Sequence, residues 1–218
     1  MLLLKYYEVH DRINDADTII IALNESSSID IASAEIGLAG LLQMAYPKKQ
    51  VFLVGELSPR LDVPATTIAQ LGLQTAKQNK YDNSLLITIG QDDDYYYDGD
   101  IQYDNRIDIS EYYSDEKLGD NTYFLNDTHC YSAIIIYLYQ NSLAYLWDDV
   151  GFIQRIKEIL YLGILDYTYG FTDCVNAPLL RLTALLFDNP TQGGLSSSDA
   201  GYLHDLYEMS IEGRIDNW

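Results

Sequence analysis

Four parts of the sequence carry oxygen-bearing side chains at positions where chemistry could take place. Residues 24–30 read Asn-Glu-Ser-Ser-Ser-Ile-Asp, residues 92–94 are three aspartates, and Asp108 and Asp166 follow further along the chain. Carboxylate oxygens are the ligands that Mg²⁺ and Ca²⁺ take in proteins, so these acids could together form a cation site. The alternative is a solvated acidic surface, because charged side chains mostly face water.

Nucleophilic catalysis finds no support in the same stretches. The serines at 26–28 have no histidine near them in sequence, and the three histidines, His10, His129 and His204, lie outside these stretches. A serine hydroxyl needs an adjacent base to act as a nucleophile, so we expect no Ser-His-Asp arrangement. The chain also lacks a G-x-G-x-x-G fingerprint, a phosphate-binding P-loop and a G-x-S-x-G elbow.

The chain as a whole is strongly acidic. Its 218 residues include 33 Asp and Glu against 13 Lys and Arg, a formal net charge of −20. Proteins that bind nucleic acid meet its phosphates with a basic face, so we expect no nucleic-acid binding. The chain also has 20 tyrosines but only five phenylalanines. Exposed tyrosines suit protein-binding surfaces, which favours a protein partner or a homo-oligomer.

The location of the protein can be predicted from its apolar runs and its cysteines. No apolar run reaches the roughly 18 residues needed to span a membrane. The first residues lack the charged and apolar regions of a signal peptide. We expect Cys130 and Cys174, which lie far apart in sequence, to be buried free thiols of a cytoplasmic protein.

Strand-like and helix-like segments alternate along the chain. Short β-branched or apolar runs predict strands at 18–23, 50–55, 84–90, 106–109 and 121–125. Longer periodic segments predict helices at 5–16, 31–46, 64–76, 131–143, 148–168, 176–189 and 196–210. This alternation predicts an α/β fold with three layers, in which a mostly parallel sheet is flanked by helices. Turn formers at 189–199 place a domain at 1–190 and a linker with a terminal helix at 191–218.

The order of these elements resembles the DHH phosphoesterase superfamily, in its oligoribonuclease and 3′-phosphoadenosine-5′-phosphate phosphatase branch. The resemblance is carried by the run "IIIALNESSSIDIASAEIGLAGLLQMAYPKKQVFLVG", in which Gly37-Leu38, Tyr46-Pro47-Lys48 and Gly55 keep the family's spacing. It extends over roughly residues 5–210. We expect the family's second, glycine-rich substrate-binding domain to be absent here, so that the sequence is either a catalytic-type domain alone or a truncated chain.

The resemblance implies a two-metal site for Mn²⁺ or Mg²⁺, with ligands on four motifs. In this chain those motifs are degenerate. Asp30 falls on a family aspartate and Asp108 on the aspartate of the naming motif, whereas histidines of the family are replaced by Asn24, Ile109 and Ser110. The other motif positions are non-ligand residues, namely Ser28, Gly90 and Tyr167.

Two functional expectations follow from the resemblance. The first is a phosphoesterase-like pseudoenzyme that has lost its metal site and acts through binding or regulation. The alternative is an active metal-dependent phosphoesterase of oligonucleotides or 3′-phosphoadenosine-5′-phosphate. In that case Asp30, Asp108 and Asp166 would serve as rearranged ligands for Mn²⁺ or Mg²⁺.

Overall fold

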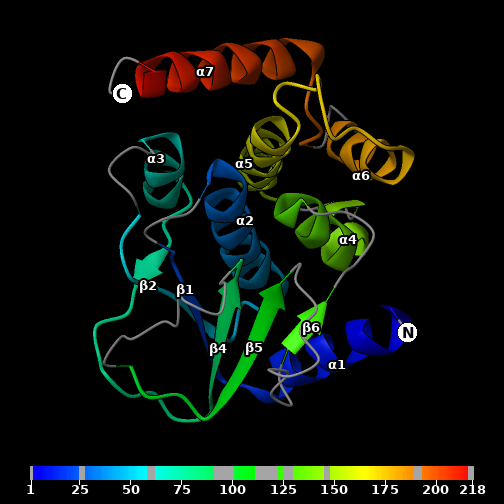
Figure 1. Ribbon diagram of the computed structural model, residues 1–218. Helices are drawn as coiled ribbons and strands as arrows, with labels where there is room; N and C mark the ends of the chain where they lie inside the picture. The colour runs from blue at the N-terminus through cyan, green and yellow to red at the C-terminus, as the bar shows by residue number, and fades with distance from the viewer. Residues whose placement is uncertain are drawn as a thin grey trace.

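The protein was studied as a computed structural model, which describes residues 2–24, 28–57, 62–90, 101–110, 122–124, 130–144, 148–188 and 193–215. Its centre is a six-stranded sheet of order β3-β2-β1-β4-β5-β6, in which every pairing is parallel (Figure 1). The strands are β1 (Thr18–Ala22), β2 (Gln50–Val54), β3 (Gln74–Thr75), β4 (Ser84–Ile89), β5 (Asn105–Ser110) and β6 (Thr122–Phe124). The predicted strands are therefore confirmed, and β3 is an additional one.

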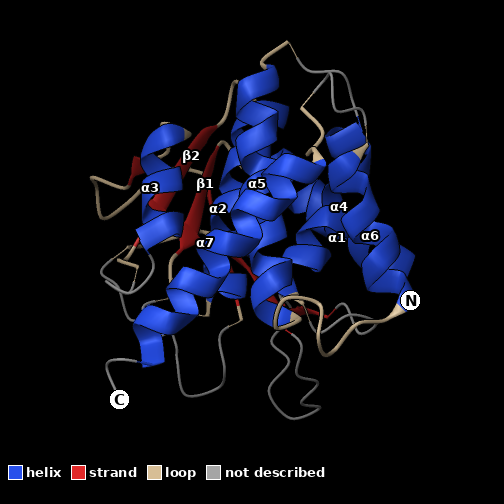
Figure 2. Ribbon diagram, turned by 90° about the horizontal axis from the view of Figure 1, so that it is seen from above, coloured by secondary structure: helices blue, strands red, loops and turns tan. Residues whose placement is uncertain are grey.

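Seven helices accompany the sheet within the described residues. They are α1 (Leu2–Asp15), α2 (Ile29–Ala45), α3 (Asp62–Gln70), α4 (Tyr131–Ala144), α5 (Val150–Tyr167), α6 (Ala177–Phe187) and α7 (Ser197–Ile215). Helix α2 packs against β1, β2 and β4, while α5 packs on α2 and α4. Helix α7 packs on α5 and lies farthest from the sheet (Figures 1 and 2). The predicted three-layer α/β class is confirmed.

The two faces of the sheet carry cores of different size. Alternate residues of the central strands, such as Ile19 and Ile87, point into the large core that α2 covers. The residues between them, such as Ile20 and Leu86, point to the opposite face, where Tyr81 completes a small cluster. All residues of β1 and β4 are buried, as their unbroken apolar runs predict.

Helix α2 is apolar on all sides because it lies between the sheet and α5. Every residue from Ala32 to Leu42 is buried. Its glycines allow α5 to approach closely, since a Cβ at Gly37 would lie 2.5 Å from Leu160 Cδ2. A helix that is hydrophobic all round belongs in the interior, and this one forms the middle layer.

The helix predicted at 64–76 is wrong in its second half. Helix α3 ends at Gln70, and β3 follows at Gln74. Gly72 has φ +63°, its N–H donates to the Ala69 carbonyl, and the Leu73 N–H donates to the Ile68 carbonyl. This pair of bonds is a Schellman motif, which ends a helix where glycine supplies the left-handed conformation.

The C-terminal helices agree with their predicted ranges. The segment at 131–143 is helix α4, as predicted, with non-helical dihedrals at Tyr139. The predicted linker leads into α7, which packs on α5. Leu195, Leu203 and Tyr207 belong to the same buried core as the sheet. The boundary near residue 190 remains a prediction.

The two cysteines and the hydropathy of the helices bear on the expected location. Cys130 and Cys174 are both free thiols, as predicted, but only Cys130 is buried. Cys174 is exposed because it lies in the turn after α5, where its φ of +56° is left-handed. Within the described part of the chain, no helix is both long enough and apolar enough to span a bilayer.

Candidate functional site

Three helix ends meet behind the carboxyl edge of the sheet. They are the N-termini of α2 and α4 and the C-terminus of α5. Ser28 caps α2, because its side chain accepts a hydrogen bond from the Ile31 N–H at 3.2 Å. The expected motif positions Asn24, Ser28, Asp30, Gly90 and Tyr167 belong to these elements or lie beside them, so the geometry here decides what these residues can do.

Asp30 caps a second helix from its place in α2. Its carboxylate accepts the backbone N–H groups of Tyr131 and Ser132, each at 2.8 Å. The Cys130 thiol donates to the same carboxylate at 3.5 Å. Tyr131 and Ser132 are the first two residues of α4, whose N–H groups have no partner within that helix. A side chain predicted as a cation ligand therefore holds the start of α4.

Asp166, the penultimate residue of α5, caps the start of α2 in the same way as Asp30 caps the start of α4. Its carboxylate accepts the backbone N–H of Asp30 at 3.2 Å. Asp30 lies in the first turn of α2, where N–H groups again need an outside acceptor. The two acids thus form a chain of capping contacts in which α5 holds α2 and α2 holds α4.

Burial raises the pKa of Asp30 to about 6, although its hydrogen bonds from Ser132, Tyr131 and Cys130 lower it. The side chain is fully enclosed, so the loss of water outweighs the donors. Burial also raises the pKa of the Cys130 thiol well above its ordinary value, and the Asp30 carboxylate adds to this effect. The thiol therefore stays protonated and is no nucleophile.

The site contains a buried acid that sequence reasoning missed. Glu35 lies one and a half turns beyond Asp30 in α2 and has no exposed surface. Its Oε1 accepts the backbone N–H of Asn24 at 3.2 Å, whereas its Oε2 has no hydrogen-bond partner among the described residues. The signal was present in the sequence, as an ionisable residue inside the apolar segment 31–42.

Burial raises the pKa of Glu35 well above its usual range, because only the Asn24 N–H opposes it. The unfolded chain releases this proton near the ordinary value, whereas the folded chain keeps it. Glu35 therefore contributes stability that is complete below the unfolded pKa and is lost as pH rises towards the folded pKa.

We expect Glu35→Gln to reduce this loss. Glutamine copies the neutral acid and keeps an acceptor for the Asn24 N–H. As pH rises above the unfolded pKa, the free energy of unfolding of the variant should increase relative to that of the parent, by up to about 1.4 kcal/mol per pH unit. Urea unfolding at pH 5, 6, 7 and 8 measures it, with Glu8→Gln on the exposed face of α1 as the matched control. Parallel pH curves for Glu35→Gln and the parent would show that this carboxyl titrates normally.

Asn24 and Gly90 lie at the carboxyl ends of β1 and β4. Asn24 is buried, and its backbone is held by Glu35. Gly90 has φ +63°, and a Cβ there would lie 2.7 Å from Ile31 Cδ1 and 3.3 Å from Tyr131 Cε2. A side chain at Gly90, the position that the resemblance matches with a bridging aspartate, would therefore require Ile31 to move and would adopt a left-handed backbone conformation.

The remaining motif positions serve packing. Ile109 is buried in the large core. Tyr167, at the last turn of α5, packs partly buried against that core. Residues 92–94 lie outside the described residues, as does His129. His10 and His204 lie on α1 and α7, where His10 bonds the Leu138 carbonyl and His204 pairs with Glu208.

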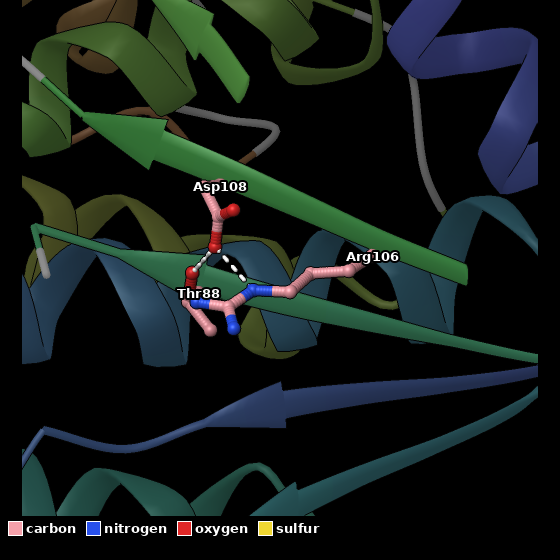
Figure 3. A network of polar contacts seen from close by, with 3 residues as sticks. All are labelled: Thr88, Arg106 and Asp108. Carbon is pink, nitrogen blue, oxygen red and sulfur yellow. Dashed lines mark hydrogen bonds and ion pairs between the residues drawn. The ribbon is translucent and has the colours of Figure 1, made fainter. Parts of the chain in front are cut away.

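Asp108 lies on the other face of the sheet. Its neighbours Ile107 and Ile109 point into the large core, so Asp108 points away from it. Its carboxylate accepts hydrogen bonds from Thr88 Oγ1 and from Arg106 Nε, the latter at 2.5 Å, and Figure 3 shows the three side chains together. The alternation of strand residues thus separates Asp108 from Asp30, which lies in α2 on the opposite side.

This donor set does not fit a two-metal centre. Such a centre needs several ligands around ions about 4 Å apart. The structure brings Asp30 and Asp166 together, but it directs their carboxylates at helix N–H groups. It places Asp108 across the sheet beside an arginine. Among the described residues, no three His, Cys, Asp or Glu side chains are grouped as metal ligands.

Comparison with known proteins identifies the fold but no family. No protein-family model and no curated protein matches the chain. Among solved structures, the fold is similar to that of an exopolyphosphatase-related protein from Bacteroides fragilis, with a TM-score of 0.62 and 15% sequence identity. The match covers 90% of this chain and 58% of the other, so the chain spans little more than half of that protein's length.

Proposed function

We propose that this chain is a phosphoesterase-like protein of the DHH type that acts by binding rather than by hydrolysis. The fold it shares with an exopolyphosphatase-related protein supports the phosphoesterase origin. The observation that carries the loss of catalysis is the position of Asp30. Its carboxylate holds the buried start of α4, where a metal-binding enzyme needs a carboxylate that faces bound ions.

The other former ligand positions support the same conclusion. Asn24 and Ile109 replace imidazoles, and Gly90, at a crowded left-handed position, replaces an acid. Asp108 is neutralised by Arg106 on the far side of the sheet. A fold is specified by its apolar strands and helices, so it can persist after the polar residues of a site have changed.

The partner in this proposal is a protein or a second copy of this chain. The formal charge of −20 disfavours polyanions such as nucleic acids. Tyrosines and a methionine are largely exposed on the described surface, with Tyr169 at 64%, Tyr202 at 63% and Met209 at 67%. Aromatic side chains and methionine are enriched where proteins bind one another.

A metal titration combined with a hydrolysis assay tests the proposal. We expect Mn²⁺ to bind no tighter than about 1 mM, as at a weak surface site. We expect no turnover of 3′-phosphoadenosine-5′-phosphate, a short oligonucleotide or inorganic polyphosphate. Asp82→Asn, at an exposed aspartate, controls for surface binding. Micromolar Mn²⁺ affinity with turnover that Asp30→Asn abolishes, and Asp82→Asn does not, would establish an active enzyme instead.

A further inference from the structure

A groove between α3, α5 and α7 lies apart from the carboxyl edge of the sheet. Its volume is about 460 Å³, which is within the range of small-molecule sites. Ile159, Leu162 and Leu203 line it and are all buried, so its deepest part is apolar. Tyr202 of α7 adds an aromatic ring that is 63% exposed.

The groove is lined by one positive and one negative side chain, Arg155 and Glu158. The Nη1 of Arg155 donates to Gln70 Oε1 at 3.0 Å, which is its only hydrogen bond to the described residues. Glu158 Oε1 accepts from Gln154 at 3.0 Å, and among the described residues its Oε2 has no bonded partner. Arg155 and Glu158 are three residues apart on α5, yet they form no ion pair with each other. No described residue therefore occupies their remaining donors and acceptor, which can contact a ligand.

The electrostatics of the groove favour a zwitterion. One cation and one anion line it, so their formal charges cancel, while the protein as a whole repels anions. Burial raises the pKa of Glu158, and the nearby Asp199 adds to this, whereas Gln154 and Arg155 lower it. A ligand ammonium group would relieve that unfavourable environment by pairing with the carboxylate.

Arg155 and Glu158 lie close enough on α5 for one small ligand to contact both. Residues three apart on a helix have Cβ atoms about 5–6 Å apart. Two extended residues span at most about 7 Å, so the termini of a dipeptide can reach both charges. Apolar side chains would then lie on Ile159, Leu162 and Leu203.

We infer that the groove binds an apolar dipeptide, with its carboxylate on Arg155, its ammonium on Glu158 and its side chains on the apolar floor. This function is independent of the metal chemistry discussed above, since none of the groove residues belongs to the former ligand motifs. It would make the protein a small-molecule binding module as well as a partner for other proteins.

Calorimetry with L-leucyl-L-leucine tests this inference on the full chain. We expect saturable binding with a dissociation constant below about 1 mM. Leucyl-leucine amide lacks the carboxylate and N-acetyl-leucyl-leucine lacks the ammonium. Each should bind the parent about tenfold more weakly, as for the loss of one charge-assisted hydrogen bond.

Paired variants assign each charge to its partner. Arg155→Met should weaken the binding of leucyl-leucine about tenfold but leave the binding of the amide unchanged. Glu158→Gln should weaken the binding of leucyl-leucine about tenfold but leave the binding of the N-acetyl compound unchanged. Arg181→Met on the exposed face of α6 and Glu56→Gln are matched controls that should bind like the parent. Absence of saturable binding up to about 10 mM would overturn the inference. The inference would also be overturned if the dissociation constant did not change when either terminus of the dipeptide is blocked and when either residue is substituted.

Discussion

Replacing Asp30 with alanine should lower the free energy of unfolding by about 3 kcal/mol. The variant leaves the N–H groups of Tyr131 and Ser132 without their acceptor at a buried helix start. Each unsatisfied buried donor costs about 1–3 kcal/mol, and the loss is partly offset because the desolvated carboxyl is gone as well. Urea or thermal unfolding measures the change, with Asp82→Ala as an exposed control.

Asp30→Asn should separate the capping role from simple loss of charge. Its amide oxygen can accept one of the two N–H groups, but its NH₂ would face the other donor. We therefore expect an intermediate loss of stability, smaller than that of Asp30→Ala. If Asp30→Ala unfolded like the parent, capping of α4 would not depend on this residue, and the main support for a lost metal site would disappear.

The same carboxyl should shape the pH dependence of stability. With a folded pKa of about 6 against an ordinary value of 3.8, Asp30 stabilises the fold fully below 3.8. That contribution falls as pH rises to about 6 and is absent above it. Asp30→Asn should therefore remove part of the decline in stability between about pH 4 and pH 6.

Replacing Gly163 with alanine should cost about 2–3 kcal/mol through overpacking. A Cβ at this position of α5 would lie 2.0 Å from Ser132 Oγ and 2.9 Å from Ser33 Cβ. Backbone on three helices would have to move apart, since these neighbours are close to their own main chains. Denaturant unfolding measures the effect.

Gly201 supplies the matched control for that substitution. It also lies inside a helix, α7, but a Cβ there would meet nothing within 4 Å. Gly201→Ala should therefore stabilise by about 0.5–1 kcal/mol, through helix propensity alone.

The double variant Gly163→Ala with Ser132→Ala should recover part of the loss, because it removes the nearest atom. It should not recover all of it, because the Ser33 contact remains. Equal effects of alanine at Gly163 and Gly201 would rule out close helix packing as the cause.

The class of the fold followed from the sequence because apolar periodicity is a local property. The β-branched runs at 18–23 and 84–90 form buried central strands, and the predicted helices at 31–46 and 176–189 are α2 and α6. The end of α3 was missed because the turn at Gly72 was not recognised as a helix stop. There a glycine in the left-handed conformation ends the helix, although the apolar spacing continues beyond it.

The roles of the acids could not be derived in the same way. Asp30, Asp108 and Asp166 were grouped because each lies in a degenerate motif. The register of β4 and β5 turns Asp108 to the opposite face. The packing of α5 and α4 around α2 turns Asp30 and Asp166 towards helix N–H groups.

The sequence by itself therefore determined the order and type of the elements except β3, the burial of the central strands, and the net negative charge. Only the tertiary structure decided which carboxylates meet a helix end, which lie beside an arginine, and which have an oxygen without a partner in the described part of the chain, as Glu35 Oε2 does. The physical reason is distance. Apolar patterning acts over neighbouring residues, whereas a carboxyl's role depends on donors that lie about 100 positions away, such as those of Tyr131 and Ser132.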